Sequence, residues 1–433
     1  MIWAQEETMS RLEIEAIQLQ RLQKTIHRIY ERVPAYRKKM EDADVKPEDI
    51  RTLKDLSKLP FVTKQDMRDQ YPFGLFAVDK EQLIRIHASS GTTGKPTVVG
   101  YTKNDLKVWT ECVSRIAAQG GATAQDTAQI CFGYGMFTGA LGLHYGLENI
   151  GAAIIPSSTG NTEKQVMYMK DFKTTLLVAT PSYALRIAEV AKSMGIDPKK
   201  DLCVKTGLFG SELLTDAMRA ELHKMWGDEI LITSNYGMSE LMGPGVSGEC
   251  KYMCGMHVNE DYFIPEIIDP QTMEVLPPGQ IGELVVTCIG KEALPLIRYR
   301  TRDIASLTYE KCKCGRTTCR MQNLGGRTDD MLKIRGVNVF PSEIEEVLLG
   351  VEEIGPHYEM IVTRQDHSDR LMIRVELLKA TDSYRELEQI QKKIEARLKV
   401  VLGITAGVSL ESPNTLQRFE GKAKRVKDLR KEV

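Results

Sequence analysis

Residues 89–96 read Ser89-Ser90-Gly91-Thr92-Thr93-Gly94-Lys95-Pro96 and follow a short strand-like segment at 83–87. This run fails the P-loop template, because Ser89 stands where the first glycine belongs and Pro96 stands where Ser or Thr follows the lysine. What remains is a run of small residues with unobstructed N–H groups and several hydroxyl groups. Such a run can wrap an anion with its backbone, and Lys95 adds positive charge. The stretch therefore predicts a phosphate-binding loop, with an ordinary Ser/Gly/Thr surface loop as the alternative.

Short apolar runs alternate with helical patterns along the large amino-terminal part of the chain. The runs span residues 127–132, 152–156, 175–179 and 229–233. This alternation predicts an α/β architecture with parallel strands. Between residues 265 and 308 the pattern changes to strand–turn–strand, since Pro277-Pro278-Gly279 is a strong turn signal. We therefore expect a large domain of mixed and parallel sheets covered by helices.

The two ends of the chain carry helical patterns of their own. Near the amino terminus apolar residues recur at three- and four-residue spacing until Pro34 ends the pattern; they are Leu12, Ala16, Leu19, Leu22, Ile26 and Ile29. Beyond residue 327 short strand patterns at 331–334, 358–363 and 371–377 precede an amphipathic helix, marked by Leu387, Ile390, Ile394, Leu398 and Val401. We predict two domains, residues 1–326 and 327–433, the second a small α+β domain of about 100 residues.

The composition is that of an ordinary globular protein, with 42% apolar and 27% charged side chains among 433 residues. Lys and Arg number 58 against 59 Asp and Glu, so the net charge is −1. This balance argues against a protein that coats nucleic acid or an anionic membrane. No apolar run approaches the roughly 20 residues that a membrane helix needs. The first ten residues carry Glu6 and Glu7 and lack an apolar core, so we expect a cytoplasmic protein without a signal peptide.

The nine cysteines do not form the pattern of a disulfide framework. Four of them stand singly and indicate buried free thiols: Cys112, Cys131, Cys203 and Cys288. The other five form two clusters, Cys250-x3-Cys254-x2-His257 and Cys312-x-Cys314-x4-Cys319. Closely spaced thiolates on turns suit tetrahedral Zn²⁺ in a reducing compartment. Six candidate ligands compete for four positions, and reduced, metal-free cysteines are the alternative.

Five motifs, in this order along the chain, resemble those of adenylate-forming enzymes, the superfamily of acyl-CoA synthetases, luciferases and peptide-synthetase adenylation domains. They are the loop at 89–96, Tyr236-Gly237-Met238-Ser239-Glu240, Tyr299-Arg300-Thr301-Arg302-Asp303, Gly326-Arg327-Thr328-Asp329-Asp330 with Lys333-Ile334-Arg335-Gly336, and Gly421-Lys422. Within the superfamily the sequence is similar to phenylacetate–CoA ligases, through residues 132–139, 336–341 and 420–423. The resemblance spans nearly the whole chain.

The resemblance implies a reaction in two halves. A carboxylate attacks the α-phosphate of ATP to give an acyl-adenylate and pyrophosphate, and coenzyme A then displaces AMP to form a thioester. Such chemistry depends on positioning and on neutralising phosphate charge. The implied ATP-binding residues are Ser89, Ser90, Gly91, Thr92, Thr93, Gly94, Lys95, Gly210, Ser211, Glu212, Asn235, Tyr236, Gly237, Met238, Ser239, Asp303 and Arg327.

The same resemblance gives individual roles to several side chains. Tyr236 would pack its ring on adenine, and Asp303 would accept hydrogen bonds from both ribose hydroxyls. Glu240 would associate with Mg²⁺, which favours oxygen ligands. Arg327 would reach the ribose or the α-phosphate. Lys422 would be the main catalytic cation, because a lysine on a flexible stem can follow the charge that develops on the phosphate and carboxylate oxygens.

In this superfamily the small domain rotates between the two half-reactions, and Asp329 matches the hinge. One orientation would deliver Lys422. The other would bring Lys333, Arg335 and Gly336 toward coenzyme A.

The resemblance also suggests an acyl pocket and a metal site. Tyr134, Phe137 and Gly139 would line the aryl pocket, where glycine allows close approach to a flat ring; ordinary glycine-mediated packing is the alternative. Four of the six candidate metal ligands match the pattern of related enzymes and would hold a structural zinc ion: Cys250, His257, Cys312 and Cys314.

The sequence thus predicts an ATP-dependent, AMP-forming ligase that joins an aryl acid, phenylacetate as the first choice, to coenzyme A. Resemblance further suggests a homodimer. One alternative is an adenylating enzyme that loads an aryl acid onto a carrier protein. Another is a non-catalytic protein whose zinc clusters dock nucleic acid, but the neutral charge counts against it.

Overall fold

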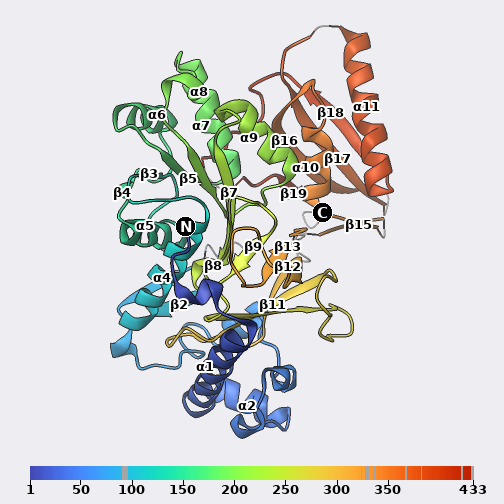
Figure 1. The fold of residues 1–433 in the computed structure, drawn as a ribbon. Coiled ribbons are helices and arrows are strands. Elements are labelled where there is room, and N and C mark those ends of the chain that lie inside the picture. The colour runs from blue at the N-terminus through green and yellow to red at the C-terminus, as the bar shows by residue number, and fades with distance from the viewer. Residues whose placement is uncertain are drawn as a thin grey trace.

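The computed structural model describes residues 1–89, 96–322, 324–326, 331–335, 337–365, 368–381, 383–420 and 423–430. The chain forms a large domain, coloured from blue to yellow in Figure 1, and a small carboxyl-terminal domain coloured orange and red. This division into a large α/β domain and a small α+β domain confirms the predicted fold class. The predicted boundary at residues 326 and 327 falls beside the undescribed residues 327–330 and stays a prediction.

An 11-stranded mixed sheet organises the large domain, in the order β10-β11-β12-β13-β9-β8-β7-β6-β5-β3-β4. One half is parallel and consists of β3 (Thr127–Ile130), β4 (Ala153–Ile155), β5 (Leu176–Ala179), β6 (Thr206–Phe209) and β7 (Leu231–Met238). The other half is antiparallel and consists of β8 (Gly243–Glu249), β9 (Met256–Val258), β10 (Phe263–Ile268), β11 (Gly282–Cys288), β12 (Tyr299–Thr308) and β13 (Arg320–Gln322). The four apolar runs and the strand–turn–strand pattern of the sequence all correspond to strands of this sheet.

Helices cover both faces of the parallel half. They are α4 (Lys103–Gln119), α5 (Gly139–Ile150), α6 (Thr162–Asp171), α7 (Pro181–Ser193), α8 (Pro198–Asp201) and α9 (Asp216–Trp226). Alternate residues of β5 enter different cores, because Leu176 and Val178 join the cluster that contains α4 and α5, whereas Leu177 and Ala179 join that of α6, α7 and α9. Because both faces of such a parallel strand are buried, its sequence is a continuous run of apolar residues.

The amino-terminal segment packs against the antiparallel half of the large domain. It contains α1 (Arg11–Arg32), α2 (Pro34–Asp42) and α3 (Lys64–Asp69), with short 3-10 helices at Gln5–Thr8, Pro47–Asp49, Leu53–Lys58 and Lys80–Gln82. The predicted helix and its end before Pro34 are confirmed. Its buried face is partly different, because Leu12 is 79% exposed while Gln18 is buried and donates to the Glu260 carbonyl (2.9 Å). A hydrogen bond, not apolar character alone, therefore determines which side chains of this helix are buried.

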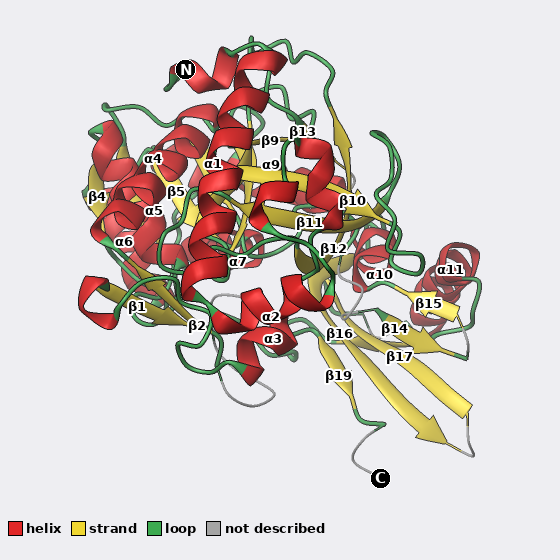
Figure 2. Cartoon of the chain, turned by 90° about the horizontal axis from the view of Figure 1, so that it is seen from below, coloured by secondary structure: helices red, strands yellow, loops and turns green. Residues whose placement is uncertain are grey.

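The small domain has its own hydrophobic core, drawn from residues between Leu332 and Val408. It contains β14 (Leu332–Ile334), β15 (Val337–Val339), α10 (Pro341–Leu349), β16 (Ile354–Gln365), β17 (Ser368–Leu377), α11 (Tyr384–Leu402), β18 (Gly407–Glu411) and β19 (Val426–Asp428). The sheet order is β18-β17-β16-β19, and β14 and β15 form a separate hairpin. Figure 2 shows these strands projecting away from the large domain, with α11 beside them.

Arg298 ties the amino-terminal segment to the sheet. Its Nε and Nη2 donate to the two carboxylate oxygens of Glu266 (3.0 Å each), and its Nη1 donates to the carbonyls of Ser57 (2.9 Å) and Leu59 (3.1 Å). The guanidinium lies 4.0 Å from the ring centroid of Phe61. Arg298 is only 3% exposed, so its removal would leave Glu266 buried without this partner.

We predict that Arg298→Met lowers the stability of the large domain by about 3–5 kcal/mol, because an uncompensated carboxylate stays buried. Urea unfolding followed by fluorescence measures the change. Lys38→Met is the matched control, since it removes the exposed pair of Lys38 with Asp42 (2.9 Å) and should change stability by less than about 1 kcal/mol. Equal, small effects of both substitutions would contradict the anchoring role of Arg298.

Candidate active site

The predicted phosphate loop connects two antiparallel strands, β1 (Arg85–Ala88) and β2 (Val98–Tyr101). At its base the Ser89 N–H donates to the Thr97 carbonyl (2.9 Å), and the Thr97 N–H donates to the Ser89 hydroxyl (3.1 Å). A strand, not the helix of a P-loop, follows the loop. The other predicted phosphate ligands lie outside the described residues: Ser90, Gly91, Thr92, Thr93, Gly94 and Lys95.

Two of the predicted adenine-binding stretches meet at the carboxyl ends of neighbouring parallel strands. Gly210, Ser211 and Glu212 follow β6, and Asn235 lies in β7. The Asn235 side-chain amide donates to the Phe209 carbonyl (2.7 Å), which ties the two stretches together. A Cβ at Gly210 would lie 3.0 Å from that amide, so the approach is close. This edge is where open α/β sheets bind ligands.

Tyr236 and Asp303 are in direct contact, although 67 residues separate them in sequence. The Tyr236 hydroxyl donates to the Asp303 carboxylate (2.5 Å), and both side chains are buried. Asp303 lies in β12, across the antiparallel half of the sheet from β7. The structure therefore brings the residues predicted for adenine and ribose into one site.

The rest of the Tyr236–Glu240 motif runs from the end of β7 into a turn. Gly237 has no room for a side chain, since a Cβ would lie 1.9 Å from the Gly243 carbonyl oxygen. Met238 ends the strand. The Ser239 hydroxyl lies 3.0 Å from that of Thr138, which precedes α5. The motif is thus joined to the stretch predicted to line the acyl pocket.

Glu240, the predicted magnesium-associated residue, is 5% exposed. The ammonium of Lys64 lies 3.4 Å from its carboxylate. A buried carboxylate with a flexible, half-exposed lysine beside it can exchange that partner for another cation. Its oxygens are of the type that Mg²⁺ prefers.

Lys291 lies next to this motif and was missed by the sequence analysis. Its ammonium donates to the Leu241 carbonyl (3.2 Å) and lies 4.2 Å from the Tyr101 ring centroid. Burial lowers the pKa of Lys291 to about 8, and the carboxylate of Asp105 opposes this shift. Gly-Lys-Glu reads as an exposed turn, so the sequence carried no signal for a buried lysine.

The predicted acyl stretch lies beside β1, the strand that leads into the phosphate loop. The Met136 carbonyl accepts the Ala88 N–H (3.0 Å), and the His87 ring nitrogen Nδ1 lies 3.1 Å from the same oxygen. These contacts place the acyl stretch next to the start of the phosphate loop.

The three residues predicted to line the acyl pocket differ in their surroundings. The Tyr134 hydroxyl lies 3.0 Å from Nδ1 of His144, a residue that the sequence analysis missed. Phe137 is 51% exposed. Gly139 is the first residue of α5, and a Cβ added there would meet no heavy atom within 4 Å. Open space at Gly139 and an exposed ring at Phe137 leave room for an organic group.

The small domain contacts the predicted adenine loop through Ala423. The Ala423 N–H donates to the Glu212 carboxylate (2.6 Å). Ala423 directly follows Gly421 and Lys422, which lie outside the described residues. Ala423, the residue after the predicted catalytic lysine, is therefore held beside the loop that follows β6.

The predicted coenzyme A residues are engaged with, or exposed on, the small domain itself. Lys333 is exposed on β14. Arg335 has a left-handed backbone (φ +50°) and donates to the carbonyls of Asp369 and Thr405 (3.0 Å each). Three further predicted residues lie outside the described ones: Arg327, Asp329 and Gly336.

Four predicted metal ligands converge between β8 and β13. The ligand atoms of Cys250, His257, Cys312 and Cys314 all lie within 4.8 Å of one another. Cys254 lies 3.5 Å from Cys312 by sulfur–sulfur distance but is not part of this group. The His257 ring nitrogen Nε2 lies 3.4 Å from the sulfur of Cys314. Its second ring nitrogen, Nδ1, lies 3.1 Å from the Thr318 hydroxyl. Three thiols and an imidazole at this spacing fit tetrahedral zinc.

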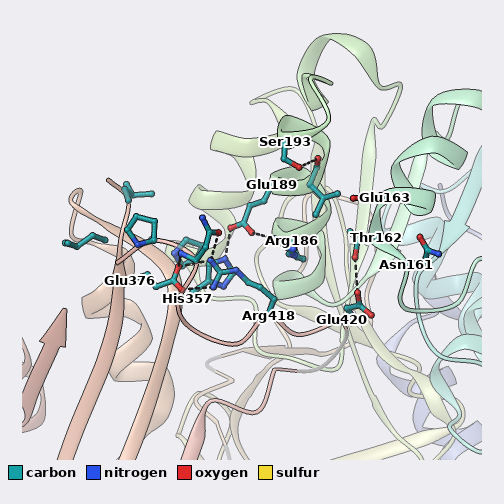
Figure 3. A pocket seen from close by; sticks show the side chains of 17 residues that line it. Asn161, Thr162, Glu163, Arg186, Glu189, Ser193, His357, Glu376, Arg418 and Glu420 are labelled. Carbon is teal, nitrogen blue, oxygen red and sulfur yellow. Dashed lines mark hydrogen bonds and ion pairs between the residues drawn. The ribbon is translucent and has the colours of Figure 1, made fainter. Parts of the chain in front are cut away.

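A cavity of about 700 Å³ lies between the domains, and its wall includes Glu420 of the 420–423 stretch (Figure 3). On the small-domain side, His357 Nε2 lies 2.6 Å from the Glu189 carboxylate of α7. At another part of the wall the Thr162 hydroxyl lies 3.4 Å from the Glu420 carboxylate. Many of its polar side chains are paired with one another, including Arg186 with Glu189 and Arg418 with Glu376.

Among the described residues, no helix combines the length and the apolar character that crossing a membrane requires.

Two family models match the chain. The model described as AMP-binding enzyme matches residues 5–290, and that described as AMP-binding enzyme C-terminal domain matches residues 336–430. A phenylacetate-coenzyme A ligase of Thermus thermophilus is 45% identical over 98% of both chains. One from Escherichia coli is 46% identical over 98% of this chain and 97% of its own.

Solved structures of a 2-hydroxyisobutyryl-CoA ligase distinguish two domain arrangements. In its postadenylation state with 2-HIB-AMP it is 29% identical and superposes with a TM-score of 0.91, covering 99% of this chain and 92% of its own. In its thioesterification state with 2-HIB-AMP and CoA, the identity is again 29% with 98% and 91% coverage, but the TM-score is 0.71. The domain arrangement described above therefore resembles the postadenylation state.

Three observations point to the same family. The contacts Tyr236–Asp303 and Glu212–Ala423 bring the predicted site residues together, the motifs follow in the expected order, and the similarity spans the full chain. The chain belongs to the phenylacetate–coenzyme A ligase family of AMP-binding enzymes and is an AMP-forming acid–coenzyme A ligase.

Proposed function

We propose that this ligase activates an aryl acid, phenylacetate in the first instance, with ATP and transfers it to coenzyme A. The observation that carries the choice of acid is the 45% identity to a phenylacetate-coenzyme A ligase over 98% of both chains. The room at Gly139 and the exposed ring of Phe137 support an aromatic acyl group. Loading of a carrier protein has no separate support among the contacts described.

In the first half-reaction a carboxylate oxygen of the acid attacks the α-phosphorus of ATP. The P–O bond to the β-phosphate breaks, pyrophosphate leaves, and an acyl-adenylate forms. Tyr236 and Asp303 would hold the nucleoside, and Ser89 to Lys95 would bind the β- and γ-phosphates. Lys422 would meet the charge that develops on the α-phosphate, with Arg327 nearby.

Glu240 would hold Mg²⁺ beside the phosphates. The ion would neutralise phosphate charge when bound. Glu240 itself fits this task, because its carboxylate is buried and its neighbour Lys64, a half-exposed side chain, can yield its place.

In the second half-reaction the sulfur of coenzyme A attacks the acyl carbon, the bond to the phosphate oxygen breaks, and AMP leaves as the thiol loses its proton. We propose that the small domain rotates about Asp329 before this step and brings Lys333, Arg335 and Gly336 toward coenzyme A. The exposure of Lys333 and Arg335 supports such a role.

We further propose that Cys250, His257, Cys312 and Cys314 hold a structural zinc ion. Four protein ligands would leave no open position for a reactant. The homodimer and the cytoplasmic location expected from the sequence stay predictions.

The function is tested by acid-dependent ATP–pyrophosphate exchange across a panel of aromatic acids, followed by thioester formation with coenzyme A. The proposal requires exchange that is fastest with phenylacetate or a close analogue, and AMP release that depends on the acid. Exchange without thioester formation, accompanied by acylation of an added carrier protein, would favour the carrier-loading alternative. Absence of acid-dependent exchange would refute adenylation.

We predict that Lys422→Ala lowers acyl-adenylate formation by roughly 10²–10³ or more, the scale of losing one preorganised charge contact. Thioester formation from chemically prepared acyl-adenylate should largely remain. Single-turnover assays of each half-reaction measure the two effects. Equal damage to both halves would show that the domains do not alternate as proposed.

We predict that dialysed wild-type protein retains about one zinc ion per chain and that Cys312→Ser loses it, because metal affinity depends on the full ligand set. Elemental analysis measures the content, and thermal unfolding should show a lower midpoint for Cys312→Ser. Cys203→Ser is the matched control, since Cys203 is a free thiol outside the cluster and is exposed, so the prediction that it is buried was wrong. Unchanged zinc content in Cys312→Ser would contradict the proposed ligands.

A further inference from the structure

The carboxylate of Glu212 bridges the two domains. Its Oε2 accepts the backbone N–H of Ser182 (3.2 Å), the second residue of α7 in the large domain. Its Oε1 accepts the backbone N–H of Ala423 (2.6 Å) in the small domain. Both oxygens of the carboxylate are therefore engaged by protein N–H groups, although the sequence had suggested a nucleotide-binding role for this residue.

Arg425 closes the contact from the other side. Its Nη2 donates to the Ser182 hydroxyl (3.0 Å), and its Nη1 donates to the Glu345 carboxylate (2.5 Å) of its own domain. The guanidinium lies 4.2 Å from the Tyr358 ring centroid, and the side chain is 13% exposed. Arg425 is thus fixed within the small domain while it reaches the same residue of α7 that contacts Glu212.

These contacts form a closed circuit: Glu212 joins Ser182 to Ala423, and Arg425, two residues further, returns to Ser182. We call this circuit the interdomain clasp. It holds the chain on the carboxyl side of Lys422 at a fixed place relative to the loop after β6. Because the domain arrangement resembles the postadenylation state, the clasp belongs to the orientation in which Lys422 serves the first half-reaction.

We propose that Glu212 is a positioning residue for adenylate formation, which it serves by holding Ala423, the residue that follows Lys422, through its N–H group. This inference rests on the proposed role of Lys422. A carboxylate suits the task because it offers acceptors to two N–H donors at once. A glutamine would turn one acceptor into an NH₂ group facing an N–H group, so at least one of the two bonds would be lost.

The test compares Glu212→Gln with wild type in the two half-reactions measured separately. We expect kcat of acid-dependent ATP–pyrophosphate exchange to fall about 10- to 100-fold, the scale of losing a hydrogen bond to a charged group. The KM for ATP and thioester formation from preformed acyl-adenylate should stay within about threefold of wild type. Ser182→Ala, which removes only the bond to Arg425, should give a smaller loss of exchange.

The matched control is Glu189→Gln. Glu189 also makes an interdomain hydrogen bond, to His357 (2.6 Å), but not to Ala423, the residue that follows Lys422 in the chain. Its substitution should lower exchange by less than about threefold. An equal loss in both variants would show that general adhesion of the domains matters, and would overturn the positioning role.

A double-mutant cycle that combines Glu212→Gln with Lys422→Ala shows whether the loss of exchange caused by Glu212→Gln depends on Lys422. If Glu212 acts through Lys422, then Glu212→Gln should lower the residual exchange of Lys422→Ala by less than about threefold. A full multiplicative loss would overturn the inference. So would a raised KM for ATP with unchanged kcat, which is the signature of an adenine contact, or a parallel fall in both half-reactions, which is that of a structural defect.

The failure of this inference is distinguishable from a failure of the proposed function. If wild type shows no acid-dependent exchange, the proposed function and the inference fall together. If wild type shows exchange and Lys422→Ala retains it, the role of Lys422 and the inference fall while the function stands. If wild type shows exchange, Lys422→Ala loses it and Glu212→Gln exchanges at the wild-type rate, the clasp alone is refuted.

Discussion

The hydrogen bond between the Ala423 N–H and the Glu212 carboxylate joins the two domains one residue away in sequence from Lys422, the proposed catalytic lysine. A catalytic cation is effective only if it is held within a fraction of an ångström of its working position, since misplacement by about 1 Å can cost 10²-fold in rate. A lysine supplied by a separate domain cannot meet that demand through its own domain's packing. For the proposed role of Lys422 that precision has to come from contacts across the junction, and the Glu212 carboxylate supplies one at Ala423, the next residue in the chain.

The sheet explains why these contacts meet at one edge. Parallel strands place the loops after β6 and β7 side by side, and Asn235 ties them together through the Phe209 carbonyl. The sheet becomes antiparallel after β7, so β12 can return along the same layer and present Asp303 to Tyr236. The change from parallel to antiparallel pairing thus brings nucleoside-binding candidates from distant sequence segments to the carboxyl edge, where the small domain docks.

The sequence predicted what local patterns encode. Continuous apolar runs identified the buried strands. The resemblance to adenylate-forming enzymes pointed to Tyr236, Asp303 and the four proposed metal ligands, and the structure brings Tyr236 to Asp303 and the four metal ligands to one another. The sequence did not predict several other contacts between residues that are distant in the chain. The spacing of apolar residues on α1 predicted that Leu12 is buried, but Leu12 is exposed. Gln18 is buried instead, because its side-chain amide donates a hydrogen bond to the Glu260 carbonyl. Lys291 reads as part of an exposed turn, and its burial against Tyr101 arises only when β2 folds beside it.

The chemistry of the junction between the two domains fits the proposed rotation of the small domain. The contacts at the interface include Glu212 with Ala423, Arg425 with Ser182 and Glu189 with His357, together with Leu349 of α10 against the apolar cluster of α7 and α9. Each neutral or charge-assisted hydrogen bond contributes only about 0.5–3 kcal/mol net, because water can replace the partner. The apolar core of the small domain lies within its own residues and would stay intact on rotation. A polar junction of this kind can define one orientation sharply and still be exchanged for another, whereas a large apolar interface would fix the domains permanently.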